Sequence, residues 1–587
     1  MSSLDTILLS FPNKDIDYPT LPLPILTAAV KQAGFTIQPR DIDVELKDAI
    51  TQPEFLESLC DEILPALLVA NANNGEVASQ VLTVLDLLHE IREKYSFDAL
   101  CEMKTFMQTR RYSEVFGTRE ATDLCRLFYR YLTRMIIFCH LLTTNPLIEK
   151  AFPEALPFRF VNDLCEDIIA KSPPLLSISY EGVQRPFTFW FLRKIRREFG
   201  YQGKIVTGGP DPTFYREKIL QHFPEIDYLV YTEGELSLPP LIDHIRGGST
   251  ALKDIPNLIY RNEAGEIQNT QASILHEIPD IVPDFSELRL DLYVSPVLPI
   301  QASRGCSWGK CRFCMHYKTY SQDFYKSPAK QVVDHMEALQ KKHAVSYFYF
   351  ADDDFSTEFR TEIADEILAR DLNVKTLGYA RFAKDLTPEI LKRWKKAGML
   401  VLEFGMESGS QKVVNHIKKG FQVDKALHTL INAAELGLIS KLLMFHDFPG
   451  ETYEDLQLSI DLVTKLSRFG LVRYFIELRT KLELQPISPL YHELQSPTHP
   501  DHEYYKKIWK PRGDFSINTA YRYKENYAIK TAMLEKAIEE SNALAAQNGI
   551  VTTNDVNLSI DLILEDLKEQ GLPLYAENQL RGQKIRA

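Results

Sequence analysis

The feature that most constrains this chain is a group of three cysteines, Cys306, Cys311 and Cys314, which fall within nine residues just past the middle of the sequence. Thiolates at this density bind soft metals, and three of them can hold three corners of a four-iron, four-sulfur cube while the fourth iron stays open to another ligand. A structural zinc ion is the alternative, but zinc normally takes four ligands, and His316 would have to be the fourth. The pattern therefore favours an iron–sulfur cluster with one open iron.

Bulk properties set the class of protein. The chain has 587 residues, too many for one ordinary domain, and its 45% hydrophobic and 25% charged residues are typical of a globular protein. A formal charge of −13 argues against nucleic acid as an obligatory partner, because phosphate-binding proteins usually present a basic face. Residues 1–10 lack the basic and apolar runs of a signal peptide or a membrane span, so we expect a cytoplasmic protein.

The remaining cysteines agree with that compartment. They lie scattered through apolar, helical sequence rather than in a spaced framework, so we expect buried thiols and no disulfides. A reducing compartment also suits an exposed iron–sulfur cluster. These five residues are Cys60, Cys101, Cys125, Cys139 and Cys165.

Residues 1–246 alternate between short apolar runs and helical patterns, which is typical of a doubly wound, Rossmann-like parallel sheet. An almost wholly helical stretch at about 47–171 interrupts this alternation. We interpret it as an insertion, after which the same sheet continues. The expected strands are 4–10, 35–44, 175–180, 204–207 and 226–231.

Two glycines, Gly208 and Gly209, directly follow one of these strands. Ligands of open α/β sheets bind beyond the carboxyl ends of the strands, and glycine lets a ligand approach the backbone. The pair is therefore a candidate binding element. The alternative is a tight turn that needs a positive φ.

The second half of the chain predicts another α/β unit. A polar, proline-bearing stretch at 247–296 indicates a small hairpin, with its turn at Asn262–Gly265, and a linker. From 297 to 490, six strand-like runs alternate with helical patterns, which predicts a partial, TIM-like (β/α)6 barrel with its active end at the strand C-termini. Residues 491–587 predict a mainly helical C-terminal extension.

Four segments of the barrel carry a resemblance. Cys311-Arg-Phe-Cys314 has an aromatic residue before its last cysteine, and Phe350–Phe355, Phe404–Gly409 and Phe448–Thr452 follow at the ends of later strands. In this order and spacing, the segments resemble the cysteine loop and the second-, fourth- and fifth-strand motifs of the radical S-adenosylmethionine superfamily. The resemblance covers roughly residues 298–490.

Membership in that superfamily would define the cofactors. It implies that the three cysteines hold a [4Fe–4S] cluster whose open iron is chelated by the amino and carboxylate groups of S-adenosylmethionine. Reduction then yields a 5′-deoxyadenosyl radical that abstracts hydrogen from an unactivated carbon, and the protein supplies placement and exclusion of water.

The same resemblance implies a set of S-adenosylmethionine contacts. We expect an aromatic ring against the adenine, two aspartates on the methionine ammonium, a glutamate and a serine on the ribose or amino acid part, and an arginine on a carboxylate. The alternatives are a solvated acidic loop, a strand-end cap and a surface arginine. The residues are Phe313, Asp352, Asp353, Glu407, Ser408 and Arg381.

The chain departs from the family pattern in two places. Its first cysteine spacer has four residues instead of three, and Trp308 within it is expected to point either at the cofactor or at the first domain. Before Pro449, where the family often has a glycine, the chain has His446 and Asp447. We predict that these two form a catalytic proton-transfer pair or a substrate contact, with a structural His–Asp hydrogen bond as the alternative.

The first domain narrows the resemblance to the cobalamin-binding subgroup, because it joins a doubly wound sheet carrying the segments 208–213 and 231–235 to such a barrel. No Asp-x-His-x-x-Gly occurs, which leaves cobalamin bound without a protein histidine, or a domain that keeps the fold and no longer binds. The contacts that the resemblance implies are Ser177, Ser179, Tyr180, Gly208, Gly209, Pro210, Thr213 and Glu233.

Many members of this subgroup transfer methyl groups, so we expect a cobalamin-dependent enzyme that methylates an unactivated carbon of a peptide or small metabolite. The alternatives are a radical cyclase, rearrangement or crosslinking enzyme whose first domain does not methylate, and a non-catalytic metal-binding scaffold. The expected partners are the substrate and an external electron donor such as flavodoxin or ferredoxin, with no nucleic acid and no membrane span.

Overall fold

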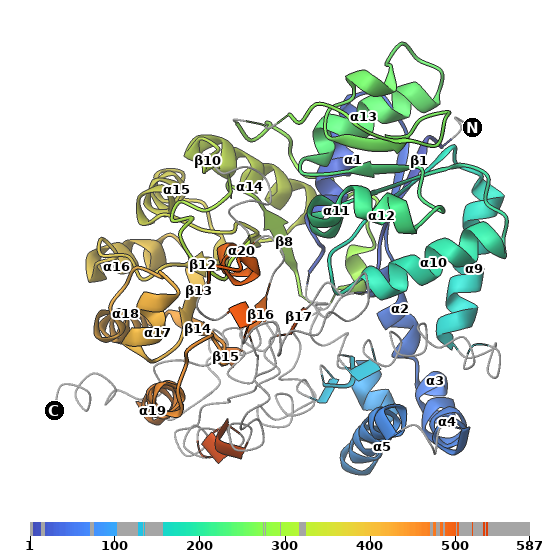
Figure 1. Cartoon of the computed structure of the whole chain (residues 1–587). Coiled ribbons are helices and arrows are strands. Elements are labelled where there is room, and N and C mark those ends of the chain that lie inside the picture. The colour runs from blue at the N-terminus through green and yellow to red at the C-terminus, as the bar shows by residue number, and fades with distance from the viewer. Residues whose placement is uncertain are drawn as a thin grey trace. The chain divides into compact units, whose positions relative to one another are not determined.

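The structure is a computed structural model that describes residues 4–12, 18–70, 75–102, 156–315, 324–469 and 482–499, apart from 274, 276, 294 and 485–487, and short pieces around 127–135, 149, 474–476, 502–503, 519–520 and 532–540. It divides into two compact units (Figure 1). Unit 1 takes in the described residues of Met1–Leu275 and Ile281–Pro296, and unit 2 takes in those of His276–Asp280 and Val297–Val556.

Unit 1 is built on a seven-stranded sheet of order β2-β1-β3-β4-β5-β6-β7. The first five strands in this order are parallel, β6 pairs antiparallel with β5, and β7 pairs antiparallel with β6. Because the chain steps from β1 out to β2 and then back across to β3, right-handed crossovers place helices on both faces and create a switch point between β1 and β3. The predicted doubly wound sheet is confirmed.

The strands of unit 1 are β1 (Thr6–Ser10), β2 (Ile37–Asp41), β3 (Leu175–Ser179), β4 (Lys204–Gly208), β5 (Tyr228–Val230), β6 (Leu258–Arg261) and β7 (Ile267–Asn269). Its main helices are α1 (Pro22–Gln32), α2 (Ile42–Ile50), α10 (Arg185–Arg197), α11 (Pro210–Tyr215), α12 (Glu217–His222) and α13 (Gly234–Ile245). The strand β1 is buried along its whole length, as its run of apolar residues predicts.

The second predicted strand is too long at its end. Alternation of apolar and polar residues continues through Val44, but α2 already begins at Ile42. Asp41 stops the strand because its carboxylate accepts a hydrogen bond from the Asp43 amide and caps the helix. Acidic residues in the first helical turn favour the same boundary.

The predicted hairpin is present, and its strands extend the first sheet. Asn262 Oδ1 accepts hydrogen bonds from the amides of Ala264 and Glu266, and Gly265 adopts a φ of 81° in the turn. Strand β6 then pairs with β5. The hairpin therefore belongs to the sheet of unit 1.

The described part of the predicted helical insertion is helical. It includes a π-helical turn at Leu59–Ile63 between two short helices. Much of the stretch between 103 and 155 lies outside the described residues. The helices are α3 (Pro53–Ser58), α4 (Leu64–Ala70), α5 (Gly75–Lys94) and α9 (Leu156–Lys171).

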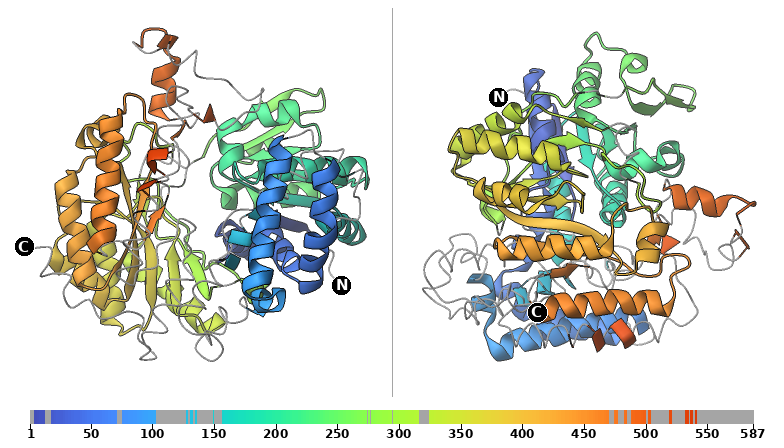
Figure 2. Two further views of the ribbon diagram at one scale, coloured as in Figure 1. Left: turned by 90° about the horizontal axis from the view of Figure 1, so that it is seen from below. Right: turned by 90° about the vertical axis from the view of Figure 1, so that its left-hand side faces the viewer.

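Unit 2 contains a parallel sheet of six strands in the order β15-β14-β13-β12-β11-β8. Chain order and spatial order agree, and the helices between the strands lie along the outer side of the sheet (Figures 1 and 2). In the described part of the chain, no ladder joins β15 to β8, so the predicted partial (β/α)6 barrel is confirmed.

The strands of this barrel are β8 (Val297–Ile300), β11 (Tyr347–Phe350), β12 (Lys375–Ala380), β13 (Met399–Glu407), β14 (Ile439–Met444) and β15 (Tyr474–Ile476). Its helices are α14 (Ala329–His343), α15 (Thr357–Ala369), α16 (Pro388–Lys396), α17 (Gln411–His416), α18 (Val423–Glu435) and α19 (Tyr453–Phe469).

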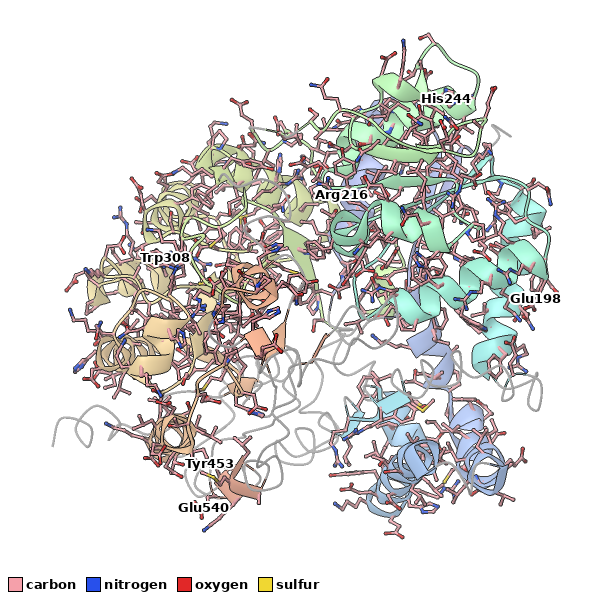
Figure 3. All side chains as sticks on the ribbon, in the orientation of Figure 1. Glu198, Arg216, His244, Trp308, Tyr453 and Glu540 are labelled. Atoms are coloured by element: carbon pink, nitrogen blue, oxygen red, sulfur yellow. The ribbon has the colours of Figure 1, made fainter. Side chains whose placement is uncertain are left out.

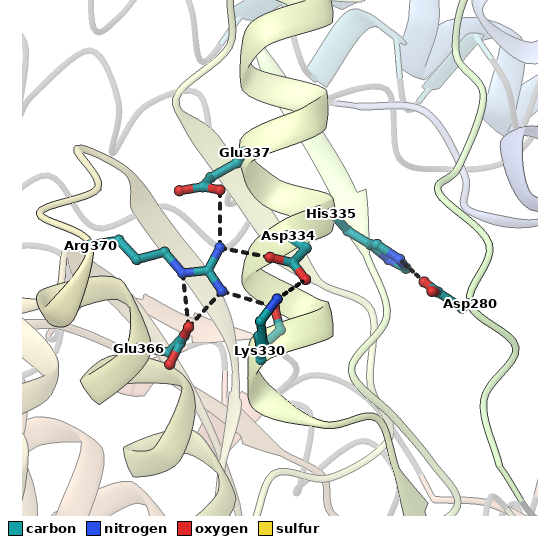
Figure 4. Close-up of polar contacts among 7 residues, drawn as sticks. All are labelled: Asp280, Lys330, Asp334, His335, Glu337, Glu366 and Arg370. Carbon is teal, nitrogen blue, oxygen red and sulfur yellow. Dashed lines mark hydrogen bonds and ion pairs between the residues drawn. The ribbon is translucent and has the colours of Figure 1, made fainter.

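Polar contacts join the first two barrel helices on their outer side (Figure 4). Arg370 pairs with Glu366 and with two acidic residues of α14, Asp334 and Glu337, at 2.8 and 3.0 Å. His335 on the same helix contacts Asp280 at 2.7 Å and thereby fixes the segment that enters unit 2. These contacts hold the barrel wall together from outside.

Of the predicted C-terminal extension, the structure describes only short pieces. Helix α20 (Pro489–Gln495) follows the barrel, and β16 (Glu483–Leu484) pairs antiparallel with β17 (Thr519–Ala520). The helical pattern predicted further along lies mostly outside the described residues. Among the helices that the structure does describe, none has the length and apolar character needed to cross a bilayer.

We predict that the glycine between α16 and β13 cannot be replaced by alanine without a large loss of stability. Gly398 has a φ of 93°, and a Cβ there would overlap the Val374 carbonyl group. Gly437, between α18 and β14, has a φ of 70° with nothing within 4 Å of a Cβ, so Gly437→Ala carries only the backbone cost of about 1–2 kcal/mol. Denaturant unfolding of the two variants should therefore show the larger loss for Gly398→Ala, and equal losses would contradict this reading.

Candidate functional site

The cysteine loop follows the first strand of the barrel. Strand β8 is fully buried, and the chain continues through the two-residue strand β9 (Ser303–Arg304) into a loop that carries Cys306, Cys311 and Cys314. All three are half-buried, and none of them forms a disulfide among the described residues. The loop thus lies at the carboxyl end of the parallel sheet, where ligands of such sheets bind.

The geometry of the loop bears on the choice between a single ion and a cluster. Among the described residues, no three His, Cys, Asp or Glu side chains are grouped closely enough to hold one metal ion. The thiolates of a cluster bind separate irons and do not need such grouping. His316, the fourth ligand that zinc would require, lies outside the described residues.

Two carboxylates that follow β11 accept hydrogen bonds from the cysteine loop and from the residues before it. Asp352 accepts hydrogen bonds from the Ala302 amide at 3.1 Å and from the Ser303 hydroxyl at 2.6 Å. Burial raises the pKa of Asp352 to about 7, against the effect of its hydrogen bonds from Ser303. Asp354 accepts a hydrogen bond from the Ser307 amide at 3.1 Å. Asp352 and Asp354 therefore support the cysteine loop. Asp353 is half-buried, and for this residue we keep the predicted contact with the ligand as the main interpretation.

The end of β13 places a buried ion pair beside the thiols. Glu407 has a φ of 63° at a bulge in the sheet and pairs with Lys419, which is also within electrostatic reach of Cys311 and Cys314. Burial acts against the ammonium charge, but the Glu407 carboxylate and the thiols more than offset it, so the pKa of Lys419 is raised. A strained backbone at a strand end is a common feature of functional sites.

Burial also controls the thiols themselves. It raises the pKa of Cys306 to about 11, with a further contribution from the Asp354 charge, and it raises the pKa of Cys311. The Arg381 guanidinium opposes both shifts, and Lys419 opposes the second. Two cations therefore favour the thiolate forms that a metal cluster requires.

The predicted contact at Ser408 has a structural explanation. Its hydroxyl lies 3.1 Å from the Ser459 hydroxyl of α19 and accepts a hydrogen bond from the Ser410 amide. Ser410 in turn donates to Asp455 at 2.7 Å, and Asp455 accepts from the Thr452 amide at 2.9 Å. This network joins the segment after the fourth strand to the segment after the fifth strand. The hydroxyl of Ser408 therefore helps to hold these two segments together.

Phe313 has an apolar neighbour in the structure. Its ring meets Phe445 edge to face, with centroids 5.0 Å apart, and packs on a buried cluster that includes Leu490 of α20. The neighbouring Arg312 donates to Glu493 of the same helix at 3.0 Å. The adenine contact of Phe313 stays a prediction, while α20 fixes the loop that carries the ring.

Trp308 has neighbours that the sequence did not predict, and its predicted direction, toward the cofactor or the first domain, stays a prediction. It packs in its own unit, on the turn at 418–420, with Arg381 over its ring. Arg381 is half-buried and lies 4.0 Å from Asp354. The contact predicted between Arg381 and a ligand carboxylate stays a prediction. The alternative, an arginine exposed on the surface, does not fit this half-buried side chain.

The two residues before Phe448 form a buried pair. Nδ1 of His446 lies 3.3 Å from Oδ2 of Asp447, a contact that lacks hydrogen-bond geometry within the described part of the chain. Asp447 has a φ of 67°, and its amide donates to Glu451 at 2.6 Å. The predicted proximity of the pair is present, and its catalytic role stays a prediction.

In unit 1, the loop after β4 has the tight turn that was the alternative to a ligand contact. Gly209 adopts a φ of 107°, and a Cβ there would lie 2.6 Å from the Tyr180 carbonyl oxygen. Thr213 donates to the Gly209 carbonyl at 2.8 Å and accepts from the Thr232 amide at 2.9 Å. Asp211, buried, receives Nε of Arg185 at 2.6 Å. Internal contacts therefore build this loop.

The remaining candidates of unit 1 lie on β3, or at or just past the carboxyl ends of the strands, with Ser177 in the middle of β3. Ser177 is buried, with its hydroxyl 2.8 Å from that of Thr6 across β1 and β3. Ser179 and Glu233 are buried, whereas Gly208, Gly209 and Pro210 stay half-buried. The hydroxyl groups of Tyr180, Thr207 and Thr232 have no hydrogen-bond partner within the described part of the chain. Unsatisfied hydroxyls at strand ends fit a polar ligand at this edge.

Sequence reasoning missed three residues of the barrel site. Asp354 belongs to the acidic run and could have been named from it. Asp455 follows Thr452 at the spacing of a helix capping box, a signal that could have identified it. Lys419 has no local signal, because its partner Glu407 belongs to the end of β13.

Comparison with known proteins places the barrel in a family. Residues 300–463 match the Radical SAM superfamily. The chain is 27% identical over 347 residues to an uncharacterized methyltransferase of Pyrococcus horikoshii, a match that covers 55% of this chain and 74% of that protein. It is 26% identical over 313 residues to an anaerobic magnesium-protoporphyrin IX monomethyl ester cyclase of Rubrivivax gelatinosus, of which it spans only 56%, and the match covers 50% of this chain.

A solved structure has the same fold over nearly the whole chain. It is the radical S-adenosylmethionine methyltransferase TsrM from Kitasatospora setae, with cobalamin and a [4Fe–4S] cluster bound. The TM-score is 0.55 at 15% identity, and the match covers 94% of this chain and 92% of the other.

We predict that Asp455→Asn lowers the unfolding free energy by about 1 kcal/mol at pH 7. Burial acts to raise the pKa of Asp455, but its hydrogen-bond donors, first among them Lys412, lower it to about 2. A depressed pKa stabilises the fold above the usual value near 3.8, and this contribution is lost as the pH falls toward 2.

Urea unfolding at pH 7 and pH 3 measures this effect, and the difference from wild type should shrink at the lower pH. Asp461→Asn, an exposed aspartate of the same helix, is the control and should change little. A difference that does not depend on pH would contradict the electrostatic origin.

Proposed function

Because residues 300–463 match the radical SAM superfamily, we propose that this chain is a cobalamin-dependent enzyme that methylates an unactivated carbon of a peptide or small metabolite. The observation that carries the proposal is one chain with two parts: a doubly wound sheet with a switch point, and a barrel whose cysteine loop follows the first strand. A TIM-like barrel alone would not favour methyl transfer, since such folds support many reactions.

In this proposal the three cysteines hold the [4Fe–4S] cluster. Their loop fits the group because it presents three half-buried thiols with two cations, Arg381 and Lys419, in electrostatic reach. When bound, the cluster and S-adenosylmethionine supply the one-electron chemistry that removes hydrogen from an unactivated carbon. The protein's part is to place these groups and to exclude water.

The contacts to S-adenosylmethionine divide by geometry. Asp353, Arg381 and Glu407 lie on strand ends around the cysteine loop and carry the charges that an ammonium and a carboxylate would meet. Asp352 and Ser408 form hydrogen bonds with Ser303 and Ser410 and thereby hold the loops that carry these contacts. Phe313 offers the aromatic face on the loop itself.

Unit 1 supports the cobalamin half of the proposal. Its strand order places a switch point between β1 and β3, and unsatisfied hydroxyls of Tyr180, Thr207 and Thr232 lie at the carboxyl ends of neighbouring strands within the described residues. The half-buried Gly208 and Pro210 leave backbone accessible there. Asp211 and Thr213 are assigned to the loop's own structure.

The division of labour follows. We assign residues 1–246 to cobalamin binding, 247–296 to the hairpin and linker, 297–490 to the radical chemistry and 491–587 to a C-terminal helical extension. The reaction needs an electron from outside, and an electron-transfer protein such as flavodoxin or ferredoxin is the proposed source.

A second candidate function has an observation of its own. The chain resembles a ring-forming cyclase at nearly the same identity as the methyltransferase, 26% against 27%. In that case, the barrel would carry out cyclisation, rearrangement or crosslinking, and unit 1 would not donate a methyl group.

We predict that anaerobically reconstituted protein binds about four irons and one cobalamin, and that its product gains the mass of one methylene unit. Iron, sulfide and visible-absorbance assays measure the cofactors, and mass spectrometry measures the product. Absence of cobalamin would end the methyl-transfer proposal, and a product that loses hydrogen would favour the second candidate.

Cys314→Ala should abolish the cluster absorbance near ~400 nm that thiolate-ligated iron gives. The matched control is Cys165→Ala, which removes a buried thiol of unit 1 whose pKa burial raises to about 12. Full iron content in the Cys314 variant would overturn the ligand assignment.

His446→Gln is expected to slow turnover by about 100-fold, the usual size of a lost proton transfer, while S-adenosylmethionine still binds. Glutamine keeps the size and polarity of the side chain in this buried position. Turnover equal to wild type would assign the pair of His446 and Asp447 to structure alone.

A further inference from the structure

Each of the four residues of the cysteine spacer makes a contact. Ser307 binds Asp354, and Gly309 adopts a φ of 59° and directs its amide at the Cys306 sulfur, 3.5 Å away. Lys310 places its ammonium 4.8 Å from the centre of the Trp308 ring. The extra residue therefore does not loop out of the fold.

Trp308 docks on a turn that follows α17. Its indole Nε1 donates to the Lys418 carbonyl at 2.8 Å. Gly420 has a φ of 84°, and a Cβ there would overlap the indole ring, so the ring lies directly on the glycine backbone. Lys418 also has a positive φ, of 58°. The turn is shaped to receive a flat ring, and it carries Lys419 between these two residues. Trp308 is labelled in Figure 3.

A second partner of the ring is Arg381, at the end of β12. Its guanidinium carbon lies 4.6 Å from the ring centre, within the range of a cation–π contact. Arg381 also lies 4.0 Å from Asp354 and within electrostatic reach of Cys306 and Cys311. The ring thus contacts both the turn at 418–420 and a cation that lies within electrostatic reach of two cysteines.

We propose that Trp308 is a positioning residue that holds Arg381 beside the cysteine loop and thereby sets the reduction potential of the cluster. The inference rests on the proposed function in one respect, because it requires that the three cysteines bind a cluster. It goes further by assigning a role to the spacer, which no family pattern supplies.

The direction of the effect follows from charge. A reduced cluster carries one more negative charge than an oxidised one, so a nearby cation stabilises the reduced form and raises the potential. Removing the ring lets the long arginine side chain leave its position. The potential should then become more negative, whereas greater exposure to water alone would act in the opposite direction.

The test compares Trp308→Leu, Arg381→Met and the double variant, each reconstituted anaerobically in the full chain. Redox titration followed by electron paramagnetic resonance gives the midpoint potential, and iron content gives the occupancy. Because Trp308 is proposed to act through Arg381, both single variants should shift the potential in the negative direction, and the double variant should shift it no further.

Three further variants act as controls. Trp308→Phe keeps a ring for Arg381 and should stay near the wild-type potential. Gly420→Ala pushes the ring off the turn and should reproduce the shift of Trp308→Leu, while Gly437→Ala, with a positive φ and free space, should not.

Each possible result of this test either supports or overturns the proposed role of Trp308. An unchanged potential in Trp308→Leu, a positive shift, or additive shifts in the double variant would overturn the inference. Loss of the cluster from Trp308→Leu but not from Trp308→Phe supports it, and loss from both overturns it. A wild-type chain without a cluster would instead overturn the proposed function.

Discussion

The barrel site depends on one physical constraint: sulfur atoms that must become thiolates lie in a partly buried loop. Burial alone raises the pKa of Cys306 and Cys311 and so works against ligation. Two fixed positive charges, on Lys419 and Arg381, oppose this effect and favour the thiolates. Lys419 is held by Glu407, and Arg381 is held by the ring of Trp308. Each cation is itself anchored by a second residue, so the electrostatic environment is built before any cofactor arrives.

This constraint explains why the surroundings of the loop are polar yet closely packed. Asp352 and Asp354 accept hydrogen bonds from backbone and hydroxyl groups of the loop, and the network through Asp455 ties two later strand ends together. The positive φ of Glu407 and of Asp447 marks strand ends whose backbones depart from the sheet in order to aim side chains. Removing one member leaves a buried charge or hydroxyl without its partner, which is costly.

In unit 1, the sequence correctly placed a glycine pair after a strand but did not decide whether the pair binds a ligand or forms a tight turn. Gly208 and Gly209 do follow a strand at the ligand-binding edge, but the positive φ of Gly209 is required by the Tyr180 backbone that it touches. The same position can still face a ligand, because the neighbouring hydroxyls of Thr207 and Thr232 are unsatisfied in the described structure. Support for cobalamin thus comes from these hydroxyls and the strand order more than from the glycines.

The sequence by itself determined the two α/β units, the order of their strands along the chain and the place of the cysteine loop, because hydrophobic period and cysteine spacing are local properties. It misplaced the end of the second strand, where the capping carboxylate of Asp41 overrides an alternating pattern. Only the tertiary structure decided the surroundings of the loop. Trp308 and Lys418 are 110 positions apart, and no local pattern announces that one ring will lie on the other's turn. Likewise, the sequence predicts Ser408 as a ligand contact and gives no sign that its hydroxyl lies 3.1 Å from that of Ser459 in α19, since a side chain's partner is set by what the fold packs against it.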